Sequence, residues 1–120
     1  RIEIYKKISH IQNEADLDDV ADELLDRFGD LPASVENLLD ISYIRALGET
    51  LGAERIEQKD GKIIITPDMA NFGNWVDIVS DHRDRMVLTP GKTPTVTYKI
   101  KKGDRPLSFL KKTLAGKVPS

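Results

Sequence analysis

Few residues in this 120-residue sequence could bind a metal or provide a nucleophile. It has no cysteine, so it has no thiolate ligand, thiol nucleophile or disulfide. The only two histidines, His10 and His82, lie on separate predicted helices. Asp77 and Asp81 share a helix face near His82, but no second histidine or cysteine lies at a ligand spacing. A solvated helix face with a boundary histidine is the favoured interpretation, and we expect no metal site.

Nucleotide and hydrolase motifs are incomplete. Gly91-Lys92-Thr93 is similar to the end of a phosphate-binding loop, but that motif needs a glycine five residues earlier, where this chain has Met86. No serine lies in the Gly-x-Ser-x-Gly frame of a nucleophile elbow. Carboxylates are numerous, but on exposed helices they stay ionised. We therefore expect no catalytic residue, no cofactor and no enzymatic activity in this chain.

Charge is distributed unevenly along the chain, although its net charge is only -2. Residues 14–30 contain eight acids and one base, Arg27, whereas residues 99–117 contain seven bases and one acid, Asp104. This contrast indicates charged docking faces, with solvated helix surfaces as the alternative.

Three helices are predicted in the first half of the chain. Apolar spacing predicts helices over residues 2–11, 14–28 and 33–51, with Asn13 as an N-cap and Gly29 and Gly52 as stops. In the second helix a single apolar stripe defines the core face: Leu17, Val20, Ala21, Leu24, Leu25 and Phe28. The opposite face then gathers five acids, Asp19, Asp22, Glu23, Asp26 and Asp30, with Arg27 beside Glu23 at i+4. The third helix is expected to be central.

The second half of the chain predicts a small antiparallel sheet. Residues 55–58 and 62–66 flank an Asp-Gly turn typical of a hairpin, and residues 85–89 and 95–100 are two further strands. Helices are predicted over residues 71–82 and 106–115. The fold class is therefore α+β: three helices, hairpin, helix, two strands and a C-terminal helix. We expect one domain, 1–120, and because Arg1 is not methionine, one excised from a larger parent.

Two features leave alternatives open. The basic segment 99–117, with Tyr98 and Phe109 nearby, could contact nucleic-acid phosphates, although the sequence pI of about 5.7 and few aromatic residues argue against it. Trp75 could anchor an interface, but a lone tryptophan in a helical stripe is more often core.

The segment Glu23-Leu24-Leu25-Asp26-Arg27-Phe28-Gly29-Asp30-Leu31-Pro32 resembles the C-terminal domain of bacterial transcription-repair coupling factors. Tyr5-Lys6-Lys7-Ile8 before it and Asn37-Leu38-Leu39-Asp40 after it extend the resemblance over about the first half of the chain. From residue 71 onward the resemblance is limited to length and element order.

The resemblance implies a parent that is an ATP-dependent DNA translocase engaging RNA polymerase, UvrA and duplex DNA. It implies that this domain lacks the motor and is an autoinhibitory clamp, which docks on the parent's N-terminal UvrA-binding module. The acidic helix fits this role because charge pairing gives orientation and partner choice in a reversible contact. We assign docking to Glu23, Asp26 and Arg27 first, then to Asp19, Asp22 and Asp30.

Alternative functions are an accessory nucleic-acid-binding domain using residues 99–117 and a structural or dimerising domain. Neither a signal peptide nor an apolar run of membrane-spanning length is present, which predicts a cytoplasmic protein without a membrane partner. We expect the isolated domain to be monomeric.

Overall fold

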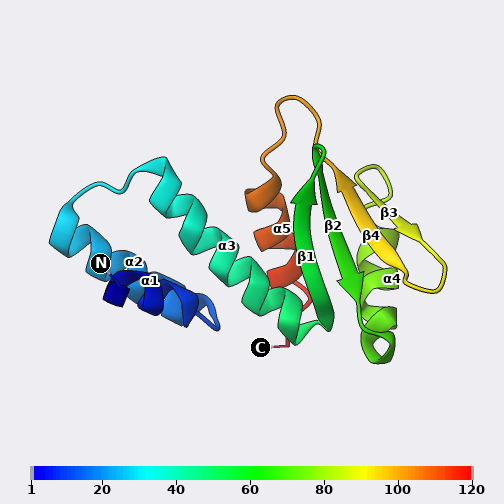
Figure 1. The fold of residues 1–120 in the computed structure, drawn as a ribbon, viewed down its shortest axis with the longest axis horizontal. Coiled ribbons are helices and arrows are strands. Elements are labelled where there is room, and N and C mark those ends of the chain that lie inside the picture. The colour runs from blue at the N-terminus through cyan, green and yellow to red at the C-terminus, as the bar shows by residue number, and fades with distance from the viewer. Residues whose placement is uncertain (1, 120) are drawn as a thin grey trace.

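The computed structural model describes residues 2–119. Arg1 and Ser120 lie outside the described residues, as does the side chain of Ile2. The molecule is elongated, with principal extents of 47 × 32 × 24 Å. Figure 1 shows a helical part at one end, a β-sheet at the other, and helix α3 running between them.

Helices α1 (Ile2–Ser9), α2 (Glu14–Phe28) and α3 (Ala33–Thr50) form the helical part. The predicted N-cap of α2 is confirmed, because Asn13 Oδ1 accepts a hydrogen bond from the Asp16 amide at 2.8 Å. Gly29, with φ +76°, ends this helix and donates its amide to the Leu25 carbonyl. Helix α3 contacts α1, α2, α5 and β1, so the prediction of a central helix is also confirmed.

The predicted core stripe of α2 is wrong at its C-terminal end. Leu24 is buried and Leu17, Val20 and Ala21 pack against the core, but Leu25 is 43% exposed and Phe28 is 60% exposed. The last turn of α2 lies at the end of the molecule farthest from the sheet (Figure 1). Helical periodicity predicts the direction of a side chain but not whether a neighbour reaches it, so these two residues remain exposed.

The sheet contains β1 (Ala53–Lys59), β2 (Lys62–Pro67), β3 (Met86–Thr89) and β4 (Thr95–Lys99) in the order β1-β2-β4-β3. All three pairings are antiparallel. Asp60 and Gly61 both have positive φ between β1 and β2, as a two-residue hairpin turn requires. The predicted hairpin is confirmed, and β4 joins it to the second strand pair in one sheet.

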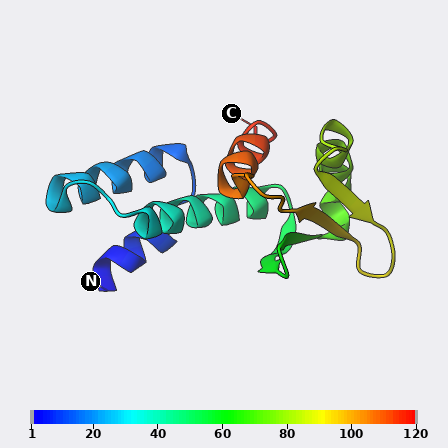
Figure 2. The ribbon, with the colours of Figure 1, turned by 90° about the horizontal axis from the view of Figure 1, so that it is seen from above.

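Helices α4 (Phe72–Asp81) and α5 (Pro106–Ala115) cover the same side of this sheet, as Figure 2 shows. A 3₁₀ turn, η1 (Met69–Asn71), precedes α4; it was not predicted, and its N-cap Asp68 accepts the Asn71 amide at 2.8 Å. Burial alternates along β2, where Ile63 and Ile65 are buried and Lys62 and Ile64 are half-buried. One face of the sheet therefore packs on helices, and the other is left without a helix.

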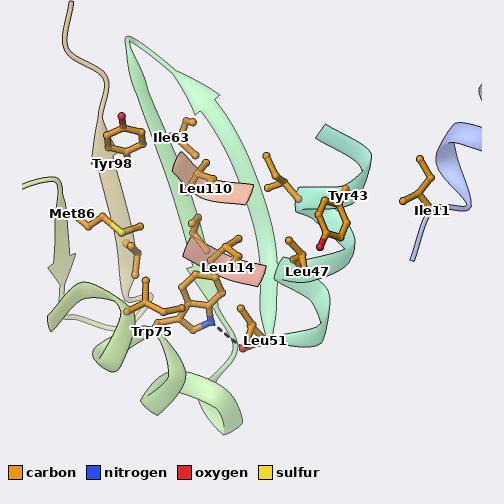
Figure 3. Close-up of a cluster of buried hydrophobic side chains, with 14 of the residues drawn as sticks. Ile11, Tyr43, Leu47, Leu51, Ile63, Trp75, Met86, Tyr98, Leu110 and Leu114 are labelled. Atoms are coloured by element: carbon orange, nitrogen blue, oxygen red, sulfur yellow. Dashed lines mark hydrogen bonds between the residues drawn. The ribbon is translucent and has the colours of Figure 1, made fainter. Parts of the chain in front are cut away.

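A continuous apolar cluster links the helical part to the sheet. Trp75 is fully buried, and its Nε1 donates a hydrogen bond to the Leu51 carbonyl at 3.1 Å (Figure 3). Leu110 and Leu114 of α5 pack in the same cluster. The structure thus places Trp75 in the core, and the α+β prediction is confirmed. Within residues 2–119, no helix has the length and apolar character needed to cross a membrane.

Candidate protein-docking surface

The acids of α2 lie on one side of that helix, away from its packed side. We use the term acidic face for Asp19, Asp22, Glu23, Asp26 and Asp30. All of them are exposed except Glu23, which is half-buried, and the neighbouring Arg27 is exposed as well. Because Leu24 on the opposite side is the buried residue of α2, the fold turns these carboxylates toward solvent. The structure therefore brings all six predicted docking residues to the surface of one helix and its end.

Glu23 differs from the other acids because it is paired within the fold. Its Oε2 lies 2.6 Å from Lys7 Nζ of α1 and 3.6 Å from Arg27 Nη1 one turn along α2. The hydrogen bond from Lys7 lowers the pKa of Glu23 below its ordinary value, with a further contribution from the charges of Lys7 and Arg27. Glu23 thus links α1 to α2, and its negative charge is largely neutralised by Lys7 and Arg27.

The other four acids are free to interact with a partner. Among the ion pairs formed within residues 2–119, none involves Asp19, Asp22, Asp26 or Asp30. Four uncompensated carboxylates near one another repel and raise the local negative potential. A partner carrying arginine or lysine would relieve that repulsion, so the arrangement suits a charge-paired contact.

Exposed apolar side chains lie on all three helices of the helical part. Phe28 and Leu25 are exposed on the last two turns of α2, and Tyr5 and Leu38 are 58% and 41% exposed on α1 and α3. Tyr5 and Leu38 line one open cleft between those helices, with a volume of about 390 Å³. Aromatic side chains beside charged ones are typical of the centre and rim of protein interfaces.

The basic segment 99–117 is divided by the fold. Lys111 Nζ lies 2.9 Å from Asp40 Oδ1, and Lys117 Nζ lies 3.0 Å from Asp81 Oδ2, so these two bases have acidic partners. Tyr98 is 1% exposed and cannot stack on a base. Its hydroxyl donates to Asp104 Oδ2 at 3.0 Å instead. Of the basic segment considered for phosphate contact, Lys111 and Lys117 are thus paired within the fold, and Tyr98 is not available for stacking.

Two of the residues considered for chemistry, His82 and Asp81, make structural contacts. His82 packs edge-on against Phe109 with ring centroids 5.1 Å apart, while Asp81 pairs with Lys117. Within the described part of the chain, no group of three or more histidine or acidic side chains is arranged to hold a metal ion. A cleft of about 530 Å³ between α3, β1 and α5 is lined mainly by aliphatic side chains.

Sequence reasoning missed the contribution of three lysines. Lys7 lies on a different helix from Glu23, and the crossing of α1 and α2 that brings them together leaves no local sequence signal. Lys59 and Lys62 flank the predicted hairpin turn and pair across it. Lys62 also lies opposite Lys99 in the β2–β4 pairing. That pairing joins residues 31 to 37 positions apart in the sequence, so periodicity alone could not find it.

Comparison with known proteins places the chain in one family. The TRCF domain model matches residues 1–74, which is more than half of the chain. The transcription-repair-coupling factor of Staphylococcus epidermidis is 49% identical over 70 residues, covering 56% of this chain and 6% of that protein. The one from Rickettsia bellii is 31% identical over 118 residues, covering 98% of this chain and 10% of that protein. The chain therefore spans a tenth or less of these relatives.

A solved structure described as the C-terminal domain of transcription-repair coupling factor has the same fold. It superposes with a TM-score of 0.80, covers 97% of this chain and 79% of that chain, and is 24% identical. Because it covers 97% of this chain, the agreement extends well beyond residue 74, where the family match ends. The chain belongs to the transcription-repair-coupling factor family of bacterial DNA-repair proteins, and its fold is that of the family's C-terminal domain.

Proposed function

We propose that this chain is an autoinhibitory docking domain. In the parent protein it closes on the N-terminal UvrA-binding module and masks the surface that UvrA recognises. Engagement of RNA polymerase and duplex DNA by the parent opens the contact. The chain forms one regulatory domain of that parent, without catalytic machinery of its own, and the ATP-dependent translocase activity belongs to other parts of the polypeptide.

The observation that carries this proposal is the free acidic face. Asp19, Asp22, Asp26 and Asp30 are exposed, and no ion pair within residues 2–119 uses them. A helix that only needed solubility would gain from pairing these acids with bases at i+4, as Glu23 does with Arg27. The unpaired carboxylates instead suit a surface rich in arginine and lysine on another part of the parent.

Reversibility follows from the chemistry of such a contact. Exposed ion pairs contribute about 0–1 kcal/mol each, so several of them orient the domain on its partner and still allow it to dissociate. A closed state favoured by about 1.4 kcal/mol would leave the UvrA surface free about a tenth of the time. The exposed Phe28 and Leu25 beside the acids could add apolar contact that water would otherwise cover.

The test reverses the charge of two exposed acids that are in no ion pair of the described residues. Asp22→Lys with Asp26→Lys, made in the intact parent, should raise its apparent affinity for UvrA by about tenfold, because the closed state is lost. Glu23→Lys with Asp26→Lys should act in the same direction, but it also removes the Lys7 contact and is expected to lower thermal stability. Binding to UvrA is measured by interferometry, and folding by circular dichroism.

A matched control changes the same number of charges elsewhere. Asp77→Lys with Glu54→Lys replaces two exposed acids on α4 and β1, neither of them in an ion pair of the described residues. This control should leave UvrA affinity at the parent value. If the Asp22/Asp26 variant folds and its UvrA affinity also stays at the parent value, the acidic face does not hold the domain closed.

A further inference from the structure

A second charged surface lies at one end of the sheet, on different elements from the acidic face. Lys59 and Lys62 pair across the β1–β2 turn, and Lys62 also lies opposite Lys99 of β4. Side chains directly opposite in antiparallel strands point to the same face of the sheet. The register thus sets three lysines in a row across three neighbouring strands, and we call this the lysine row.

The lysine row is on the face of the sheet that no helix covers. In β2 and β4 the alternate residues Ile63, Ile65, Val96 and Tyr98 are buried under the helices. Lys62 and Lys99 therefore point to the other side, where the next row of partners is Glu57, Ile64, Thr97 and Val87. Val87 in that row is 60% exposed. Figure 2 shows α4 and α5 together on the opposite side.

The loop that follows β4 adds two more lysines at the same end. The Ile100 amide donates to the Gly61 carbonyl at 2.9 Å, which fixes this loop against the hairpin turn. Asp104 Oδ2 accepts from the Lys101 amide at 2.8 Å and from the Tyr98 hydroxyl, so the loop is closed by its own acid. Lys101 and Lys102 are exposed beside the row. The β1–β2 turn and this loop lie together at the top of Figure 1.

This arrangement has a cost that an anionic partner would remove. Like charges directly opposite in a sheet destabilise the pairing. Within residues 2–119 no ion pair involves Lys59, Lys62, Lys99, Lys101 or Lys102, whereas Lys111 and Lys117 each have an acidic partner. The acids near these lysines are Glu57, Asp60 and Asp104, and Glu57 is already paired with Arg55, so positive charge remains in excess. The fold therefore maintains five free lysines at one end of an uncovered sheet face.

We propose that the lysine row, together with Lys101 and Lys102, binds the phosphate backbone of duplex DNA. Neighbouring strands lie about 4.8 Å apart, so the row extends over about 10 Å. One strand of duplex DNA rises about 3.4 Å along the helix axis per phosphate, so a row of this length aligned with the axis covers the rise of about three phosphates. Among the described residues, this face carries no exposed aromatic ring for base stacking, and Thr97 in the next row offers only a hydroxyl. Contact is with the backbone and does not depend on sequence.

The acidic face does not cancel this surface. It lies on α2 at the far side of the helical part, well separated from the hairpin turn in Figure 1. Exposed charges separated by more than about 10 Å are screened at moderate salt. The net charge of -2 therefore describes neither end of the molecule. The proposal is independent of the clamp, because it uses other residues and another partner.

Fluorescence anisotropy of a labelled duplex, titrated with the 120-residue chain at several salt concentrations, tests the proposal. Binding should weaken steeply as salt rises, since each phosphate contact releases counterions. Lys62→Gln with Lys99→Gln should weaken binding about tenfold or more and reduce the slope of log affinity against log salt by about two. Lys101→Gln with Lys102→Gln should have the same effect, and tests the surface if the strand variant fails to fold.

The control removes two positive charges at a distance from this end. Arg83→Gln with Lys92→Gln alters two exposed bases in the turn after α4 and the turn before β4. This control should bind DNA with the same affinity as the unmodified chain and with the same dependence of affinity on salt. Equal loss in the control and in the lysine variants would mean general charge attraction and would overturn the proposal. The proposal would also be overturned if the unmodified 120-residue chain did not bind DNA at low salt. Equally tight binding to polyglutamate would overturn it too, because the partner would then be an acidic protein surface.

Discussion

At the residue scale, Glu23 has a different task from its acidic neighbours. Among the ion pairs of the described residues, it is the member of the acidic face whose carboxylate pairs within the domain, with Lys7 and Arg27. The sequence placed Glu23 on the correct face because helical periodicity is local. It could not reveal the partner on α1, because the crossing of two helices depends on their packing. The four aspartates, which need no such partner, were the more predictable part of the surface.

The pairing of Glu23 predicts a pH dependence of stability. Its pKa is lowered in the folded state, mainly by the hydrogen bond from Lys7. A carboxylate with a lowered folded pKa stabilises the fold above its unfolded value, ordinarily 4.5, and this contribution is lost as pH falls through the folded value. As pH falls below 5, the free energy of unfolding measured in urea should therefore decrease more steeply for the unmodified chain than for Glu23→Gln. Identical pH profiles would show that the pair contributes nothing.

At the element scale, helix and hairpin bounds were mostly predictable, and contacts between elements were not. Helices α2 and α5 begin and end where caps, glycines and periodicity predict. The 3₁₀ turn before α4 was missed because its cap, Asp68, follows a strand that ends on proline. Exposure of Phe28 was missed because periodicity does not reveal how far the neighbouring helices extend.

The junction between α3 and β1 predicts a sharp difference between two glycines. Gly52 has φ +86°, and a Cβ there would clash with the side chain of Asn71, whereas Gly29 has φ +76° and open space around it. Gly29→Ala should cost about 1–3 kcal/mol from backbone strain alone, because φ +76° with ψ -152° is a conformation that essentially only glycine adopts. Gly52→Ala should cost about 1–3 kcal/mol more, because Asn71 must move as well. Chemical denaturation measures both, and equal costs would contradict the close approach.

At the scale of the whole molecule, the fold separates two oppositely charged surfaces. The acidic face lies on the helical part, and the lysine row lies at one end of the sheet, on the face that no helix covers. Composition gave only the contrast between residues 14–30 and 99–117. The fold changed the basic surface by pairing Lys111 and Lys117 with acids and by bringing Lys59 and Lys62 beside Lys99. Such a rearrangement depends on strand order, which has no local signal in the sequence.

This separation means that the two charged surfaces should respond independently to mutation. Asp22→Lys with Asp26→Lys should release the clamp and leave the lysine row intact, whereas Lys62→Gln with Lys99→Gln should weaken DNA binding without changing UvrA affinity. Measuring both affinities for both variants checks this expectation. A strand variant that raised UvrA affinity as much as the acidic-face variant would mean that the two surfaces form one interface.

The most direct test of the clamp is calorimetric titration of this chain into the isolated UvrA-binding module at low and at high salt. We expect weak one-to-one binding at low salt, weaker binding at high salt, and loss of binding with Asp22→Lys and Asp26→Lys. Absence of binding at low salt, or binding that neither salt nor this charge reversal changes, would contradict the account.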